Sequence, residues 1–148
     1  MLSDGDHIRN LLGTYNERMD LADHDGVGAL FGEDGVLATE DGTELARGAS
    51  GIAAFYRGMV KLHDGEQRTK HLVANTVLEE DGSDVILARS SYVVLQATEA
   101  LPLQPIIAGR YQDRFERGDD GAWRWAERRF QTDLVGHLSQ HLGHLGSD

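Results

Sequence analysis

The hydrophobic pattern of this chain changes period near residue 69, and that change constrains the fold more than any other feature. Before it, apolar residues recur at helical spacing. Ile8, Leu11, Leu12, Tyr15 and Met19 are the first such set. After it, four long segments have the pattern of strands, namely 69–80, 84–96, 106–117 and 123–132. Long antiparallel strands that follow a helical first half predict an α+β fold, with helices on one face of a curved sheet.

The first half contains two further helical segments and a hairpin. The segment 25–31 predicts a short helix and the segment 49–63 a longer one with an apolar stripe. Between them, 32–48 has the pattern of two short strands around Asp41-Gly42, a dipeptide that is typical of tight hairpin turns.

Composition excludes several classes of function. The formal net charge is −11 at pH 7, which argues against nucleic-acid or acidic-membrane partners, because clustered Lys and Arg bind a phosphate backbone. There is no cysteine, which excludes disulfides, thiolate nucleophiles and thiolate metal sites. Without a secretion signal or an apolar run of about 20 residues, we expect a cytoplasmic protein that does not span a membrane. The 148 residues show no linker or repeat and predict one domain, 1–148.

The strand predicted over 69–80 presents an unusual inward face. A period of two places His71 and Asn75 on one face, together with Val73 and Val77. An imidazole transfers protons in either direction near neutral pH. His71 is therefore either a buried side chain satisfied by its neighbours or a proton carrier at a pocket. Asn75 either holds a substrate carbonyl or bonds nearby backbone.

Asp20 falls in the last turn of the first predicted helix, near the edge of its apolar stripe. The helix macrodipole disfavours a negative charge there, so the carboxylate suits a general base or a group that orients a base. The alternative is an Asp at a helix end that faces water. If Asp20 meets His71 at a pocket, its carboxylate would select the ring tautomer and raise the basicity of the imidazole.

The last predicted strand offers one candidate cation. In "WRWAERR", strict alternation places Arg124, Ala126 and Arg128 on one face and both tryptophans with Glu127 on the other. An inward guanidinium at Arg128 would stabilise an enolate or a leaving anion. The alternative is an ion pair of Arg128 on the outer face of the sheet.

Three tyrosines are candidate substrate contacts: Tyr15, Tyr56 and Tyr92. Tyrosine pairs a large apolar ring with a hydroxyl that finds a hydrogen-bond partner when it is buried. Aromatic residues at helical spacing also serve as ordinary core, so these side chains either line a pocket or fill the interior.

The C-terminal segment "HLSQHLGHLG" places His137, His141 and His144 at i, i+4 and i+7. Such a stripe suits zinc, copper or nickel. Its glycines weaken a helix, however, and no carboxylate lies at ligand spacing, so we interpret it as a structural, apolar packing segment with no metal. Phosphate-binding loops and other cofactor motifs are missing from the sequence as well, and no cofactor is predicted.

The order of these segments resembles the SnoaL-like branch of the nuclear-transport-factor-2-like superfamily over nearly the whole chain. Four pieces carry the resemblance: "IRNLLGTYNERMDLADHDGVGALFGEDGVL", "RTKHLVANTVLEEDG", "GRYQDRFER" and "DGAWRWAERR". The resemblance implies a cone-shaped α+β barrel, a curved antiparallel sheet wrapped around N-terminal helices, with one apolar pocket.

The resemblance also implies roles for particular residues. Lyases of this family carry an Asp at the end of the first helix, which Asp20 matches, and a catalytic His at the start of the strand that holds His71. Dehydrohalogenases have a pocket arginine in the strand of Arg128. The family's dehydratases have a second histidine on the strand after His71, but "SDVILARSSYVVLQ" contains none. Scytalone-type dehydration is therefore not the expected reaction.

Two functions follow as hypotheses. The first is a cofactor-independent lyase, isomerase or cyclase that acts on a small apolar metabolite such as a polyketide, terpenoid or aromatic compound, through an Asp20–His71 dyad. The second is a non-catalytic ligand-binding or assembly domain that resembles the small subunit of ring-hydroxylating dioxygenases. Since both faces of 72–78 carry apolar residues, we expect a homodimer or homotrimer. A monomer mass in light scattering would refute that expectation.

Overall fold

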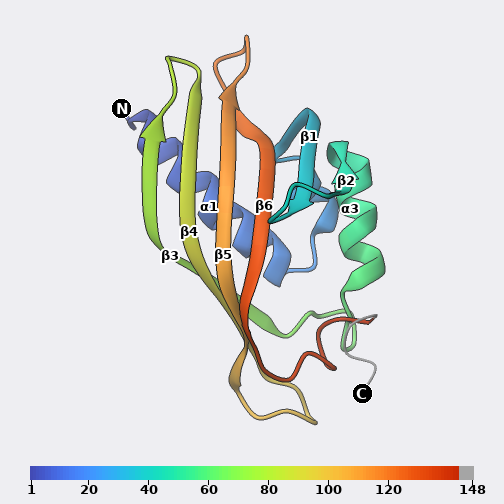
Figure 1. The fold of residues 1–148 in the computed structure, drawn as a ribbon. Helices are drawn as coiled ribbons and strands as arrows, with labels where there is room; N and C mark the ends of the chain where they lie inside the picture. The colour runs from blue at the N-terminus through green and yellow to red at the C-terminus, as the bar shows by residue number, and fades with distance from the viewer. Residues whose placement is uncertain (144–148) are drawn as a thin grey trace.

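The structure, a computed structural model, describes residues 1–143 of the chain, which form a six-stranded sheet and three helices (Figure 1). The elements are α1 (Asp4–Asp20), α2 (His24–Gly28), β1 (Phe31–Thr39), β2 (Glu44–Arg47), α3 (Gly48–Met59), β3 (Thr69–Glu80), β4 (Val85–Gln96), β5 (Gln104–Arg117) and β6 (Trp123–Val135). The predicted α+β class is confirmed. None of the helices formed by residues 1–143 has the length and apolar character needed to cross a bilayer.

The strands lie in the order β2-β1-β6-β5-β4-β3, and the sheet is curved but open, with β2 and β3 at its edges. All neighbouring strands are antiparallel except β1 and β6, which run parallel. The sheet is therefore mixed rather than purely antiparallel, because β1 returns beside the last strand and not only beside its neighbour in the sequence. Figure 1 shows α1 crossing one face of this sheet and α3 lying beside β1 and β2.

Helix α1 begins with a capping box and ends beside β3. The hydroxyl of Ser3 accepts from the backbone N–H of Asp6 at 3.1 Å, and the Asp6 carboxylate accepts the backbone N–H of Ser3 at 3.0 Å. This reciprocal pair satisfies two helix-end donors. The helix buries Ile8, Leu12 and Tyr15 against the sheet, so that its last residue, Asp20, comes to lie beside β3.

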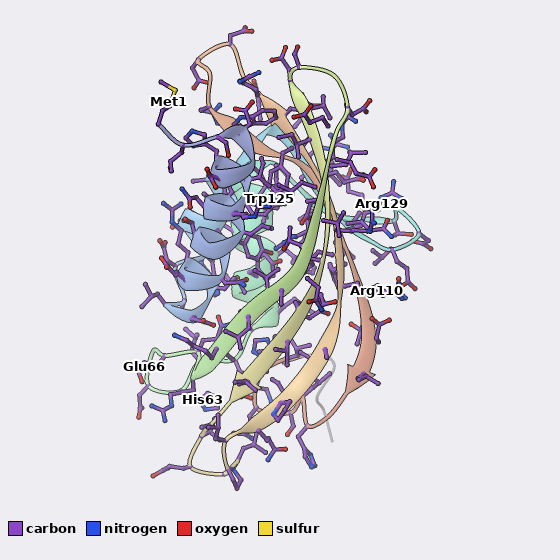
Figure 2. The ribbon with its side chains drawn as sticks, turned by 90° about the vertical axis from the view of Figure 1, so that its left-hand side faces the viewer. Met1, His63, Glu66, Arg110, Trp125 and Arg129 are labelled. Atoms are coloured by element: carbon purple, nitrogen blue, oxygen red, sulfur yellow. The ribbon has the colours of Figure 1, made fainter. Side chains whose placement is uncertain are left out.

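The face of the sheet that the helices cover is divided into two regions. At the packed end, a cluster centred on Trp125 includes Phe31, Leu37 and Phe115, and none of these four side chains is more than 4% exposed. At the other end, Tyr92, Tyr111 and their neighbours line a cavity, and we call this region the hollow end. Figure 2 shows Trp125 between the helices and the sheet.

The opposite face of the sheet carries charge. Arg110 pairs with Asp133 at 2.9 Å, and Figure 2 shows Arg110 and Arg129 pointing away from the helices. Two apolar residues of β3, Leu72 and Val77, are also exposed. The homodimer or homotrimer inferred from this strand stays a prediction.

Candidate active site

The carboxylate of Asp20 and the imidazole of His71 are in direct contact, although the two residues are 51 positions apart. Asp20 is the last residue of α1, and His71 is the third residue of β3. Oδ1 of Asp20 lies 2.6 Å from Nδ1 of His71, and the side chains are 15% and 7% exposed. A carboxylate on Nδ1 sets the ring orientation and leaves Nε2 as the nitrogen that exchanges protons with a ligand.

The position of the Asp20 carboxylate is determined by further donors. The backbone N–H of His71 lies 3.1 Å from both carboxylate oxygens, and the hydroxyl of Thr69 donates to Oδ1 at 3.0 Å. Thr69 accepts from Nε2 of Gln67 at 3.1 Å, and Oε1 of Gln67 lies 3.3 Å from the ring of His24. Since Gln67 and His24 are buried, this chain of hydrogen bonds fixes the dyad from the interior of the protein.

His71 faces a cavity of about 360 Å³ at the hollow end. This volume lies within the range of about 300–1,000 Å³ that is usual for small-molecule sites. Its walls are mostly apolar and come from α1, α3, the four long strands and the segment after β6, as Met19, Phe55, Val94, Ile107, Phe130 and Leu138 show. The arrangement offers space for one small ligand in apolar surroundings beside the imidazole of His71.

Four tyrosines line this cavity. The hydroxyls of Tyr15 and Tyr56 are hydrogen-bonded to each other, and the ring of Tyr92 stacks on that of Tyr111 at 4.4 Å. Burial raises the pKa of each of the four hydroxyls, so all are protonated donors at neutral pH. Tyr15, Tyr56 and Tyr92, the candidate substrate contacts, all line the cavity, and their contact with a substrate stays a prediction. Tyr111 was missed, because strand alternation alone does not show which end of β5 is hollow.

Arg128 faces the interior but does not line the cavity. Its guanidinium is 1% exposed and forms two hydrogen bonds to Asp113, at 2.8 and 3.1 Å. It also lies 3.5 Å from the ring centre of Tyr111 and 4.3 Å from that of Tyr15. Burial alone would lower the pKa of Arg128, but the charge of Asp113 outweighs it and the pKa is raised. The cation is thus permanent and lies behind two cavity tyrosines.

A β-bulge in β6 explains this orientation. Glu127 pairs with Arg114 and Trp125 pairs with Phe115, so that Ala126 is an extra residue in the strand. One extra residue reverses the side-chain alternation that follows it. The expectation that Arg128 lies on the face opposite Trp125 was therefore wrong.

A second bulge removes Asn75 from the cavity. Ala74 pairs with Ser91 and Val77 with Arg89, so two residues of β3 lie opposite Ser90. Asn75 is exposed with a left-handed φ of 56°, and it is not among the cavity residues. The prediction that Asn75 and Val77 share the face of His71 was wrong. Asparagine tolerates this backbone conformation better than most residues, which is a signal that sequence analysis could have used.

His141 was not predicted as a site residue, yet it lines the cavity. Residues 137–143 form no helix, and Leu138 and Leu142 of this segment also face the cavity. The ring of His141 lies edge-on to that of His71, with centroids 5.9 Å apart. His144, the third histidine of the stripe, lies outside the described residues. Within residues 1–143, His, Asp and Glu side chains do not converge into a group of three that could hold a metal.

Comparison with known proteins identifies the family of the chain and proteins of similar fold. A family model described as a SnoaL-like domain matches residues 1–129. No curated protein matches. The structure of a variant of Rv3472, a protein of unknown function from Mycobacterium tuberculosis, has 31% identity and a TM-score of 0.70, with coverage of 87% of this chain and 71% of that chain.

Two further structures from Novosphingobium aromaticivorans are similar in fold. One, provisionally named a scytalone dehydratase, has 19% identity and a TM-score of 0.71, and covers 88% of this chain and 85% of that chain. The other, provisionally named the β subunit of an aromatic-ring-hydroxylating dioxygenase, has 21% identity and a TM-score of 0.69, with coverage of 88% and 89%. At these identities the likeness concerns the fold.

Proposed function

The chain belongs to the SnoaL-like family, and from that premise we propose that it is a cofactor-independent acid–base enzyme, a lyase, isomerase or cyclase, that acts on a small apolar metabolite. The observation that carries the proposal is the 2.6 Å contact between Asp20 and His71 at the wall of an apolar cavity. Polyketides, terpenoids and aromatic compounds are substrate classes whose apolar character matches the cavity walls.

The proposed first step is removal of a proton from a carbon beside a carbonyl. The lone pair on Nε2 of His71 takes the proton, and the electron pair of the C–H bond moves toward the carbonyl oxygen to form an enolate. Asp20 stabilises the imidazolium that results. The enolate then expels a leaving group, is reprotonated at another carbon, or closes a ring, and His71 returns its proton.

Two features of the walls support the stabilisation of an enolate. The hydroxyls of Tyr15 and Tyr56 are neutral and hydrogen-bonded to each other, so the pair keeps one O–H that it can donate at the cavity. The guanidinium of Arg128, whose charge is paired with that of Asp113, lies against the rings of Tyr15 and Tyr111 in surroundings of low dielectric, where the dipole of the pair acts strongly. In this proposal Arg128 acts through the tyrosines and does not touch substrate.

The cavity favours this proposal over the assembly-domain hypothesis. An assembly domain without catalysis is expected to fill its interior with its own side chains. Here about 360 Å³ stays open beside a buried imidazole that is paired with a half-buried carboxylate, an arrangement that a purely structural domain does not require.

The experiment follows proton exchange on a simple ketone. In D2O, 2-tetralone incorporates deuterium at C1, beside its carbonyl, and NMR measures the rate with and without protein. We expect the wild type to exceed the buffer rate. The part of the rate that exceeds the buffer rate should fall about 10²–10⁴-fold in His71→Gln and about 10–100-fold in Asp20→Asn. His137→Gln, a substitution of an exposed histidine, is the matched control. Full activity in His71→Gln, or no excess rate in the wild type, would contradict the proposal.

A further inference from the structure

The backbone around His141 is held firmly although residues 137–143 form no helix. The carbonyl of His141 accepts the backbone N–H of Lys61 at 2.8 Å, and the N–H of Gly143 donates to the carbonyl of Met59 at 2.8 Å. Nζ of Lys61 donates to the carbonyl of Ser139 at 2.6 Å. These bonds dock the segment on the end of α3 and on the connection that follows it.

The residue before His141 is bound from two further sides. The carbonyl of Gln140 lies 2.8 Å from Nε2 of His63 and accepts from Nε2 of Gln96 at 3.0 Å. Gln96 also donates to the carbonyl of Gln67, the residue that supports Thr69 in the dyad network. His141 is thus positioned by the same framework as the dyad, and backbone contacts determine its place.

The imidazole of His141, in contrast, lacks a partner of its own. The residue is 6% exposed, and Nδ1 has no hydrogen-bond partner among residues 1–143. An unsatisfied buried polar atom costs about 1–3 kcal/mol and calls for an explanation, of which a ligand or an ordered water is one. The ring lies at the cavity, 5.9 Å between centroids from His71, so neighbouring atoms of one small molecule reach both histidines.

The imidazole of His141 is uncharged at neutral pH. Burial, and then the charge of His71, lowers the pKa of His141 to about 4, although Asp20 acts in the opposite sense. At neutral pH the ring is therefore uncharged and offers one donor and one acceptor nitrogen. His71 has the Asp20 carboxylate on Nδ1 and is suited to accept a proton. Pairs of titratable groups in different environments take different parts in acid–base chemistry.

We propose that His141 binds the oxygen atom of the substrate, on the carbon next to the one from which His71 removes a proton. The inference rests on the proposed function and defines its substrate class more closely: an apolar compound with a carbonyl at this one place. As negative charge develops on that oxygen, a hydrogen bond from the His141 ring strengthens, which helps the proton transfer to His71.

The test compares a ketone with its parent hydrocarbon. The affinities of 2-tetralone and tetralin are measured by NMR titration of the wild type and of His141→Phe, which keeps a ring but removes both nitrogens. We expect the wild type to prefer the ketone by about tenfold, the value of one good hydrogen bond. His141→Phe loses this preference and binds tetralin within about twofold of the wild type. His137→Phe, in the same segment but exposed, behaves as the wild type.

Two further measurements separate this inference from the proposed function. His141→Asn keeps a donor and should recover part of the preference, while unchanged tetralin affinity shows that each variant is folded. A preference that persists in His141→Phe, or a wild type that binds neither compound, overturns the inference. If the preference depends on His141 but the wild type does not accelerate deuterium exchange, the oxygen-binding role stands and the proposed enzyme function fails.

Discussion

The packed end and the hollow end lie on the same face of the sheet, but the first is filled by side chains and the second contains a cavity. At the packed end, Trp125 is fully buried and contacts Phe31 and Phe115, with ring centroids at 5.6 and 4.7 Å. At the hollow end, Tyr92 and Tyr111 of β4 and β5 have stacked rings that border open space. We expect from this difference that the packed end contributes most of the stability, while the hollow end keeps a cavity with polar groups at its walls.

Arg128 lies at the boundary between the two ends. Its guanidinium contacts the rings of Trp125, Tyr15 and Tyr111, and Asp113 neutralises its charge. A buried ion pair of this kind is weak evidence for stability, since the loss of solvation opposes the attraction of the charges. Its position between core and cavity fits a role in setting the electric field at the site.

The largest difference between the ends should appear when large side chains are truncated. Trp125→Ala at the packed end is expected to lower the free energy of unfolding by about 3–5 kcal/mol, because neighbouring side chains cannot fill the hole. Leu138→Ala at the cavity should lower it by about 1 kcal/mol, since Leu138 is only half-buried and already borders open space. Urea unfolding measures both. Equal losses would show that the hollow end is packed after all.

A smaller effect is expected from the titration of His141. Its pKa in the folded state lies below the value of about 6.5 in unfolded chains, so the unfolded state binds the proton first as the pH falls. The stability that this group contributes is complete above pH 6.5 and is lost between there and about pH 4. The loss should reach about 2–3 kcal/mol in this window.

The check is to compare the pH dependence of unfolding in the wild type and in His141→Gln, which cannot titrate at this position. The variant should lack this part of the acid destabilisation, while contributions from carboxylates are common to both proteins. Parallel curves would mean that His141 does not differ from a solvent-exposed histidine, and the uncharged ring assumed above would lose its support.

The smallest change in the free energy of unfolding is expected when a larger side chain is introduced at the cavity. Val94→Phe points a larger side chain into the cavity and should change the free energy of unfolding by less than about 1 kcal/mol, while 2-tetralone no longer binds. Ala88→Leu, in the buried cluster of the packed end, should cost about 1–3 kcal/mol because the added methylene groups must fit among buried side chains. If Val94→Phe is as destabilising as Ala88→Leu, the two ends do not differ in packing as described.

The elements could be predicted from the sequence because their signals are local. The strand β3 has the bounds that its pattern indicated, and the turn at Asp41-Gly42 joins β1 to β2 with Gly42 at φ 87°. Periodicity and turn residues act over a few positions, so a single sequence is sufficient to find them. The contact of Asp20 with His71, in contrast, was inferred mainly from family resemblance, since no local rule joins a helix end to a distant strand.

Three features of the site escaped the sequence for physical reasons. Each bulge adds one residue to a strand but cannot be recognised in the sequence pattern, so the faces of Asn75 and Arg128 were assigned wrongly. His141 lies in a segment without periodic structure, whose place is determined by hydrogen bonds to Lys61 and Met59, far away in the sequence. Information of this kind is present only in the assembled tertiary structure.

The parallel pairing of β1 with β6 has a consequence for how the molecule forms. Val36 and Leu37 pair with Glu127 and Arg128, almost at the other end of the chain. A ribosome must therefore complete β6 before β1 finds its partner, and contacts between such distant segments slow the search for the native state. Until then the early hairpin has an unpaired strand edge, and a nascent chain has most need of protection against aggregation during this interval.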